Sequence, residues 1–316
     1  MSVIPITLDP QMIAVIKKRR TLTLGPQDQG NLSIDDIRKN YNHERAWWNA
    51  IKPKMDSVEE LSVPGPLRDI ALRIYRPFNQ NPRPTLLYLH GGGWVVGNLD
   101  THDRVMRLLA TFSGAVVVGI DYALSPEHKF PVAINETLTV IQWLETSGRN
   151  HGLDPTRLAL GGDSAGANMA VAVTQLHHQR DHQAIRFLLL YYGAYGLTDS
   201  WSWQQYGNAD YEFTREEKAF YLDSYLTNSS DHSDSRFNVL SGDIACLPQA
   251  FIAAAECDPL HDDSVALHEA MRKANRPAHL EVYPGVLHSF IHYSRLLDKA
   301  TQALRDGAHA LTKALS

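Results

Sequence analysis

Apolar residues gather in seven short runs, separated by stretches long enough for helices. The runs have the length and composition of buried strands, and the intervening stretches include Val132–Leu144, Ala165–Leu176 and Leu297–Leu311. Buried strands that alternate with helices predict a mostly parallel sheet with helices on its faces. The runs are Ile70–Tyr75, Thr85–Leu89, Ala115–Ile120, Leu158–Leu160, Phe187–Tyr191, Ala250–Ala254 and Leu280–Val282. In such sheets the chemistry lies just after the strands, at their carboxyl ends.

Two segments depart from this alternation. The first fifty residues are helical in pattern, with Ser33 as a helix cap and Ile37, Tyr41 and Trp48 roughly on one face. Later, the stretch from Gly193 to Pro248 contains 56 residues, whereas an ordinary crossover needs about a dozen. This insertion is rich in aromatic residues, which indicates a lid over a pocket; the alternative is that the rings pack the insertion's own small core.

The strongest chemical motif follows the run Leu158–Leu160. Gly162, Ser164 and Gly166 form a Gly-x-Ser-x-Gly pattern between a predicted strand and a predicted helix, which is typical of a nucleophile elbow. The turn lifts the serine hydroxyl clear of the sheet, at the positive end of the helix dipole. The pattern therefore predicts that Ser164 is a catalytic nucleophile.

A glycine-rich loop follows the run Thr85–Leu89. His90 precedes three glycines and Trp94, and loops of this type supply oxyanion-binding N–H groups in esterases, together with the residue after the nucleophile. Here that residue is Ala165. Consecutive glycines allow the backbone to approach a ligand closely, so the loop predicts an oxyanion hole; a merely flexible loop is the other interpretation.

A nucleophilic serine needs a base and an orienting carboxylate, which follow it along the chain in the order acid, then histidine. Asp258 and His288 come after the last two runs and fit these roles, with Glu256 as the alternative acid. Asp262 and Asp263 are expected to open the next helix and to need no further role. The other nearby histidines are predicted to be surface or capping residues on helices, namely His261, His268 and His292.

Composition narrows the class of protein. A net charge of −5 argues against a nucleic-acid partner, and no apolar run is long enough for a membrane helix. Cys246 and Cys257 offer neither a disulfide framework nor a metal motif, and the start of the chain lacks the pattern of a secretory signal. We therefore expect a soluble cytoplasmic protein.

His177, His178 and His182 are expected at an exposed helix end, and no metal site is predicted.

Four motifs together resemble the hormone-sensitive-lipase-like family of α/β-hydrolases. They are the glycine loop at 90–94, the Asp-Tyr-Ala-Leu-Ser-Pro-Glu stretch at 121–127, the elbow at 162–166, and Asp258-Pro259-Leu260 followed by His288. Residues 97–104 and 292–295 are closer still to the bacterial acetyl esterases of that family. The likeness extends from about residue 40 to the end of the chain.

The resemblance implies an α/β-hydrolase fold with a mostly parallel eight-stranded sheet and a helical cap. Helices at 1–55 would contribute to the cap together with an insertion at about 195–245, and 56–316 would form the catalytic domain. Ser164, Asp258 and His288 would form the triad. Three N–H groups would hold the oxyanion, those of Gly91, Gly92 and Ala165. Supporting roles are expected for His90, Gly93 and Asp163, and for Asp121 and Glu127 near the site.

The predicted reaction is hydrolysis of short-chain esters, from acetyl to butyryl, through an acyl-enzyme and without a cofactor. Bulky residues favour a short pocket; Trp94, Tyr192 and Phe290 are its candidate walls. A triad of this kind could also cleave amides or longer acyl esters, and some proteins of this fold bind a ligand without turnover. The expected partner is a small ester, with neither nucleic acid nor membrane. Whether the protein is a monomer or a homodimer stays open.

Overall fold

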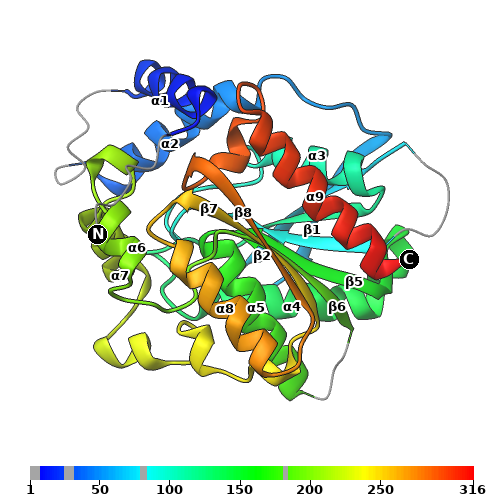
Figure 1. Ribbon diagram of the computed structural model, residues 1–316. Coiled ribbons are helices and arrows are strands. Elements are labelled where there is room, and N and C mark those ends of the chain that lie inside the picture. Colours follow the sequence, from blue (N-terminus) through cyan, green and yellow to red (C-terminus); the bar gives the residue numbers. More distant parts are fainter. Residues whose placement is uncertain (1–7, 25–31, 79–83, 181–183) are drawn as a thin grey trace.

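The fold is built on one twisted sheet (Figure 1), seen in a computed structural model that describes residues 8–24, 32–78, 84–180 and 184–316. Among these residues eight strands pair in the order β1-β2-β4-β3-β5-β6-β7-β8. The strands are β1 (Ser57–Pro64), β2 (Asp69–Arg76), β3 (Pro84–Leu89), β4 (Val116–Asp121), β5 (Asp154–Asp163), β6 (Ile185–Tyr191), β7 (Gln249–Cys257) and β8 (Ala278–Leu287). Pairing is antiparallel from β1 to β4 through β2 and parallel everywhere else. The prediction of a mostly parallel, eight-stranded α/β sheet is confirmed.

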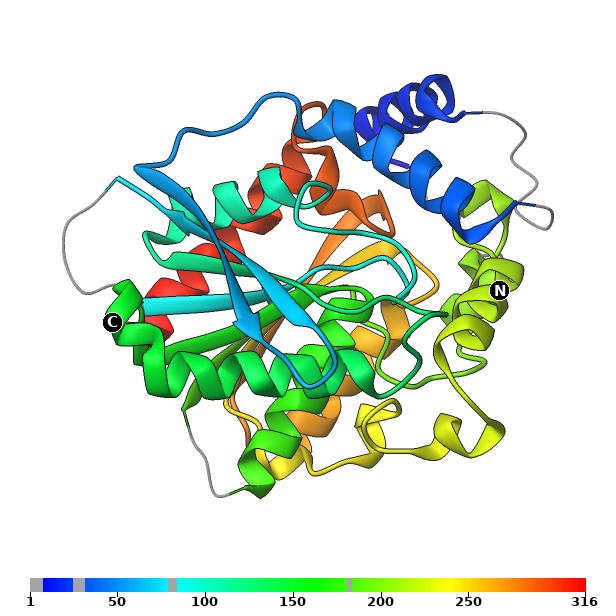
Figure 2. The same cartoon turned by 180° about the vertical axis from the view of Figure 1, so that it is seen from behind.

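Seven of these strands coincide with the apolar runs of the sequence, whereas β1 has no such run. In β1 only Val63 is buried, because the strand lies at the sheet edge and pairs with β2 alone. Figure 2 shows β1 and β2 in blue on the near side of the molecule. An edge strand that faces solvent gives no hydrophobic pattern, so the period of the sequence could not reveal it.

Helices cover both faces of the sheet. The α-helices are α1 (Pro10–Leu22), α2 (Ile34–Asn49), α3 (Asp103–Ser113), α4 (Val132–Ser147), α5 (Ala165–Gln179), α6 (Trp201–Tyr206), α7 (Arg215–Tyr225), α8 (His261–Lys273) and α9 (Asp298–Leu315). Short 3-10 helices are η2 (Gly148–His151), η3 (Ala209–Tyr211), η4 (Ser229–Ser233), η5 (Val239–Ser241), η6 (Ile244–Cys246) and η7 (Phe290–Tyr293).

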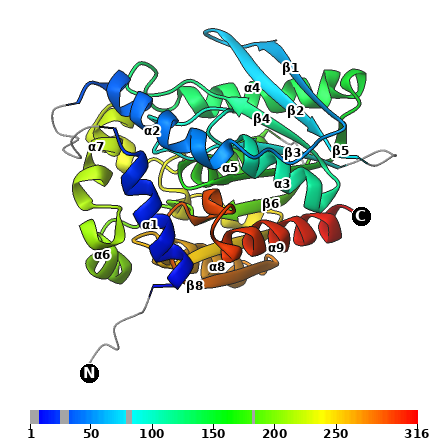
Figure 3. The same ribbon diagram turned by 90° about the horizontal axis from the view of Figure 1, so that it is seen from above.

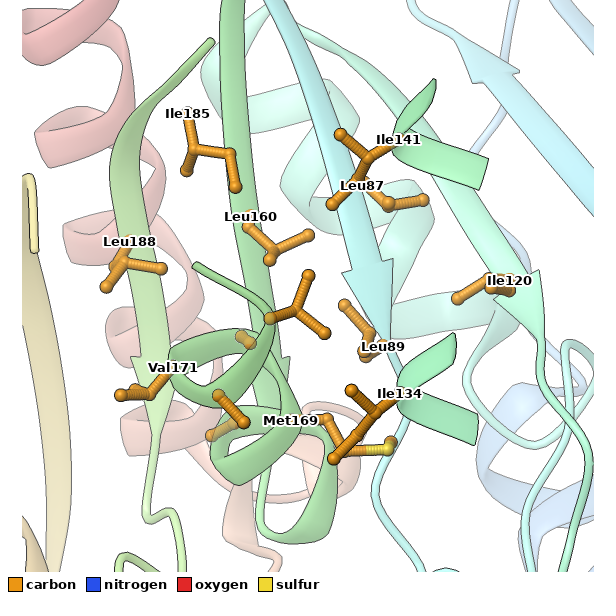
Figure 4. Close-up of a cluster of buried hydrophobic side chains, with 14 of the residues drawn as sticks. Leu87, Leu89, Ile120, Ile134, Ile141, Leu160, Met169, Val171, Ile185 and Leu188 are labelled. Carbon is orange, nitrogen blue, oxygen red and sulfur yellow. The ribbon is translucent and has the colours of Figure 1, made fainter. Parts of the chain in front are cut away.

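Alternate residues of each strand divide the interior into two cores. On β3, Leu87 and Leu89 face the core beneath α4, α5 and α8, while Leu86 and Tyr88 face the core beneath α3 and α9. Figure 4 shows part of the first core, where Leu89, Ile134 and Met169 meet. Burial on both faces explains why the central strands read as continuous apolar runs. This sandwich holds the carboxyl ends of the strands in fixed positions.

Four helices lie together beyond one end of the sheet. In Figures 1 and 3, α1 and α2 lie beside α6 and α7, which belong to the segment between β6 and β7. Arg19 of α1 forms ion pairs with Glu44 of α2 and with Glu212 of the inserted segment. Arg38 of α2 forms an ion pair with Glu127 and donates to the carbonyl of Val95 at 2.9 Å. The N-terminal helices are thus bonded both to the insertion and to the loops after the central strands.

β8 forms the other edge of the sheet, as expected for the run Leu280–Val282. Val282 is 38% exposed there. Across the described ranges, none of the helices has the length and apolar character needed to span a membrane.

Candidate active site

Ser164 stands at a sharp turn between β5 and α5. Its φ of +53° is unfavourable for a residue with a side chain, and its N–H donates to the carbonyl of Tyr191 at 2.9 Å. A Cβ at Gly162 or Gly166 would collide with the carbonyl oxygen of Leu89. Glycine at both positions is therefore required for the turn, as the sequence pattern indicated.

Three side chains from different loops meet at this turn. The Ser164 hydroxyl lies 2.9 Å from His288 Nε2, and His288 Nδ1 lies 2.8 Å from Asp258 Oδ2. Because a carboxylate only accepts, His288 carries its proton on Nδ1, which leaves Nε2 to accept from the serine hydroxyl. Asp258 is fully buried, and its other oxygen accepts from the N–H of Leu260 at 2.8 Å. Serine, histidine and aspartate thus form a continuous hydrogen-bonded chain.

The structure separates the two candidate carboxylates. Glu256 Oε2 accepts from the N–H of Gly285 at 2.8 Å and makes no hydrogen bond to His288. Asp258 lies just beyond the end of β7 and reaches His288, whereas Glu256, within β7, is bonded to the loop at Gly285. The Glu256 alternative has no support in the geometry.

The glycine loop requires one correction to the sequence prediction. The Gly91 N–H donates to Asp163 Oδ1 at 3.0 Å, so Gly91 is not free to bind an oxyanion and that assignment was wrong. The N–H groups of Gly92, Gly93 and Ala165 donate no hydrogen bond to another described residue. Gly93 and Ala165 line a cavity at Ser164. The third glycine of the loop thus lies in the cavity wall beside Ser164, and the first is bonded to Asp163.

His90 anchors the same loop from its other side. Its Nδ1 donates to the Gly91 carbonyl at 2.8 Å, and its ring stacks on Tyr122 with 4.2 Å between ring centres. The Tyr122 hydroxyl donates to the His90 carbonyl at 2.7 Å. Burial lowers the pKa of His90 to about 3, so the imidazole is neutral at ordinary pH.

Asp163, next to the nucleophile, is the centre of a buried polar cluster. Tyr88 donates to Oδ1 at 2.8 Å, beside the Gly91 N–H, and the Nε2 atoms of His102 and His292 each lie 3.4 Å from a carboxylate oxygen. Burial alone would raise the pKa of Asp163, but His102 and His292 lower it well below its usual value. The supporting role expected for Asp163 thus has a physical basis.

His292 was expected on a helix surface, and this expectation was wrong. It lies in η7, is buried, and points at Asp163; burial lowers its pKa well below the usual value, with a further contribution from Arg45. By residue type and distance, His102, Asp163 and His292 could together hold a metal ion, since one ligand atom of each lies within 4.8 Å of the others. The Tyr88 and Gly91 donors already bonded to Asp163 favour a hydrogen-bonded cluster instead.

A second histidine prediction also fails. His177 was expected at an exposed helix end, but it is buried and its Nε2 lies 3.1 Å from Glu145 of α4. The last turn of α5 packs against α4, which a helical pattern by itself does not show. His182 falls outside the described residues.

The cavity at Ser164 is small and mostly apolar. The centre of a water molecule can reach about 70 Å³ of it. Trp94 lines it as predicted, together with insertion aromatics that include Trp203, Phe213 and Tyr221. Tyr192 and Phe290 do not line it and were wrongly predicted as walls. Tyr192 is buried with its ring edge against His288, 4.9 Å between centres, and Phe290 packs behind Tyr192.

Two charged residues in the cavity wall were not foreseen. Lys218 comes from α7, and Asp263 from the first turn of α8. Asp263 was expected to serve the helix alone, yet it is buried and accepts three N–H bonds from the strand end after β6, from Tyr195, Gly196 and Leu197. Its position in an acidic pair at a helix start concealed this role, because that pattern is usual on exposed helices.

Comparison with known proteins agrees with this geometry. A family model described as the alpha/beta hydrolase fold matches residues 86–292. The chain belongs to the hormone-sensitive-lipase-like family of α/β-hydrolases. An acetyl esterase of Salmonella agona is 42% identical over 279 residues, covering 87% of this chain and 85% of the relative, and an acetyl esterase of Salmonella enteritidis matches equally well.

Solved structures of two esterases share the whole architecture. A hyperthermophilic esterase from the archaeon Pyrobaculum calidifontis has a TM-score of 0.91 at 29% identity, covering 97% of this chain and 98% of that one. A thermostable esterase from Pseudomonas putida has a TM-score of 0.90 at 28% identity, covering 100% and 99%. The protein is accordingly a carboxylic ester hydrolase.

Proposed function

We propose that this family member is a serine carboxylesterase that cleaves short-chain acyl esters, acetyl to butyryl, through an acyl-enzyme. The observation that carries the proposal is the hydrogen-bonded chain Ser164–His288–Asp258, at 2.9 and 2.8 Å. The acetyl esterase relatives support the same acyl class.

In the first step Ser164 Oγ attacks the ester carbonyl while His288 Nε2 takes the serine proton. Asp258 accepts from Nδ1 and stabilises the imidazolium that forms. The proton then passes to the departing alcohol, which leaves Ser164 acylated. A water molecule, deprotonated by His288, attacks the acyl group and releases the acid.

The carbonyl oxygen gains negative charge in both steps and requires donors. Ala165 provides an N–H at the positive end of the α5 dipole, and the N–H groups of Gly92 and Gly93 are the remaining donors of the loop. We assign the oxyanion hole to these three groups, in place of a set that includes Gly91. One donor of this kind typically contributes about 10²–10³ in rate.

The short-chain preference rests on the size of the cavity and on its aromatic wall. About 70 Å³ of space for the centre of a water molecule accommodates a small acyl group, and Trp94, Trp203 and Phe213 line the cavity. Helices α6 and α7 carry part of that wall, which supports the interpretation of the insertion as a cap.

Hydrolysis of p-nitrophenyl esters from acetate to palmitate tests the proposal, with Ser164→Ala beside the wild type. We expect the highest kcat/KM at two to four acyl carbons and a loss of several orders of magnitude in the variant. Ser113→Ala is the matched control, because Ser113 is a buried serine outside the site, bonded to the Leu109 carbonyl. Rates that rise with chain length would remove the short-chain claim. An amidase or a ligand-binding protein would replace the proposal if no ester is turned over.

A further inference from the structure

The wall of the cavity at Ser164 is mostly apolar, and its polar members beside the nucleophile include Thr198, Lys218, Tyr221, His232 and Asp263. Lys218 Nζ donates to the Thr198 carbonyl at 2.9 Å, lies 3.4 Å from the Leu197 carbonyl and sits 4.2 Å from the centre of the Trp203 ring. An ammonium group has three donors, so one remains beyond those two carbonyls. Burial lowers the pKa of this amine.

Asp263 contributes the complementary group. Its three backbone hydrogen bonds, at 2.7, 3.0 and 3.2 Å, all reach Oδ1, whereas Oδ2 is buried and has no hydrogen-bond partner. The side chain is 1% exposed. A buried carboxyl oxygen without a donor costs free energy, and this one belongs to a residue that lines the cavity. Lys218 does not satisfy it, since no ion pair joins the two.

We propose that Lys218 and Asp263 form a polar subsite that selects esters carrying a free hydroxyl group near the scissile bond. This inference rests on the proposed esterase function and names its substrate class. When Asp263 is ionised, a hydroxyl placed between the two groups accepts from the Lys218 ammonium and donates to Asp263 Oδ2.

Charged alternatives fit less well. A carboxylate in the substrate would pair with Lys218 but would lie against Asp263, and an ammonium group would pair with Asp263 but would lie against Lys218. Like charges in a confined site are unfavourable. The small volume limits the polar group of the substrate to the size of a hydroxyl on a short chain.

The experiment measures how fast the wild-type enzyme hydrolyses each member of two pairs of isosteric esters. The release of acid reports the rate. 2-Hydroxyethyl acetate against propyl acetate tests a hydroxyl on the alcohol side, and methyl 3-hydroxypropanoate against methyl butyrate tests one on the acyl side. We expect kcat/KM at least about tenfold higher for the hydroxyl ester in one pair, which also identifies the side. Equal values in both pairs would overturn the inference, as would a preference for monomethyl succinate over both hydroxyl esters.

Variants connect the preference to the subsite. Lys218→Met keeps an unbranched side chain, one atom shorter, but cannot donate, and it should reduce the hydroxyl preference about tenfold. Lys129→Met is the matched control, because Lys129 also donates to two backbone carbonyls, of Asp223 and Leu226, but does not line the cavity. An unchanged preference in Lys218→Met would refute the assignment. Should that variant not fold, the wild-type comparison of pairs still decides. If the esterase proposal itself were wrong, the enzyme would not hydrolyse propyl acetate either. That result differs from equal rates for both members of a pair.

Discussion

The carboxylate of Asp163, the residue directly before Ser164, accepts a hydrogen bond from the Gly91 N–H at 3.0 Å. The nucleophile elbow and the glycine loop are therefore joined by a buried, charge-assisted hydrogen bond. In the proposed mechanism, Asp163 therefore links the turn that carries Ser164 to the loop that carries Gly92 and Gly93.

Asp163→Asn should lower kcat about 10- to 100-fold with a smaller change in KM. The amide oxygen of asparagine can still accept a hydrogen bond. The amide nitrogen donates, however, and would replace the carboxylate oxygen that now faces His292 or Tyr88, so we expect the glycine loop to shift. Steady-state kinetics on p-nitrophenyl acetate measures the effect. Tyr88→Phe removes one of the same donors and should give a smaller loss; equal kcat in wild type and Asp163→Asn contradicts the positioning role.

Asp258→Asn should reduce kcat by about 10⁴, because the amide cannot stabilise the imidazolium or hold the His288 proton on Nδ1. Glu256→Gln is the matched control, two residues earlier and bonded to the Gly285 N–H instead of to His288. We expect it to change kcat by less than about tenfold. A larger loss in the glutamate variant would transfer the role of the acid to Glu256.

Leu222→Ala should extend activity to longer acyl chains. Leu222 lines the cavity from α7, and truncating its side chain opens space for a longer acyl chain. In an apolar pocket, one substrate methylene changes the discrimination between two substrates by about 1–3 kcal/mol. The ratio of kcat/KM for octanoate to that for acetate should rise about tenfold. Leu240→Ala, also partly buried but outside the cavity wall, should leave this ratio unchanged. A constant ratio in both variants means that another part of the wall sets the chain length.

Asp263 should make the protein less stable as the pH rises from about 4 to about 7. Burial raises the pKa of Asp263 to about 7 against 3.8 for an exposed aspartate, although its backbone hydrogen bonds and Lys218 oppose the shift. Between these values the folded state binds a proton that the unfolded state has lost, so the free energy of unfolding falls with pH, by at most about 1.4 kcal/mol per unit, and levels off above 7.

Urea unfolding of the wild type and of Asp263→Asn at pH 4, 6 and 8 measures this contribution. The asparagine variant keeps an acceptor for the three N–H groups but carries no titrating carboxyl, so its stability relative to the wild type should increase with pH. A difference in stability that is the same at all three pH values would show that Asp263 is already ionised when folded at pH 4.

Local patterns in the sequence were sufficient for the strand–turn–helix at Ser164, since a sharp turn demands Gly162 and Gly166 on either side of it. They also placed Asp258 and His288 after strands, because carboxyl ends of parallel strands share one edge of the sheet. The alternation of apolar runs and helices was enough for the fold class. Each of these inferences depends on interactions between residues close in the chain, or on a topology rule that holds for the whole fold class.

Tertiary structure alone decided which long-range partners each side chain meets. His292 and His102 converge on Asp163, the Gly91 N–H is consumed by that carboxylate, and Lys218 and Asp263 share a cavity although 45 positions separate them. Tyr192 faces His288 instead of the substrate cavity. A residue's type sets what it can donate or accept, but burial and packing between distant segments determine which partner is within 3 Å.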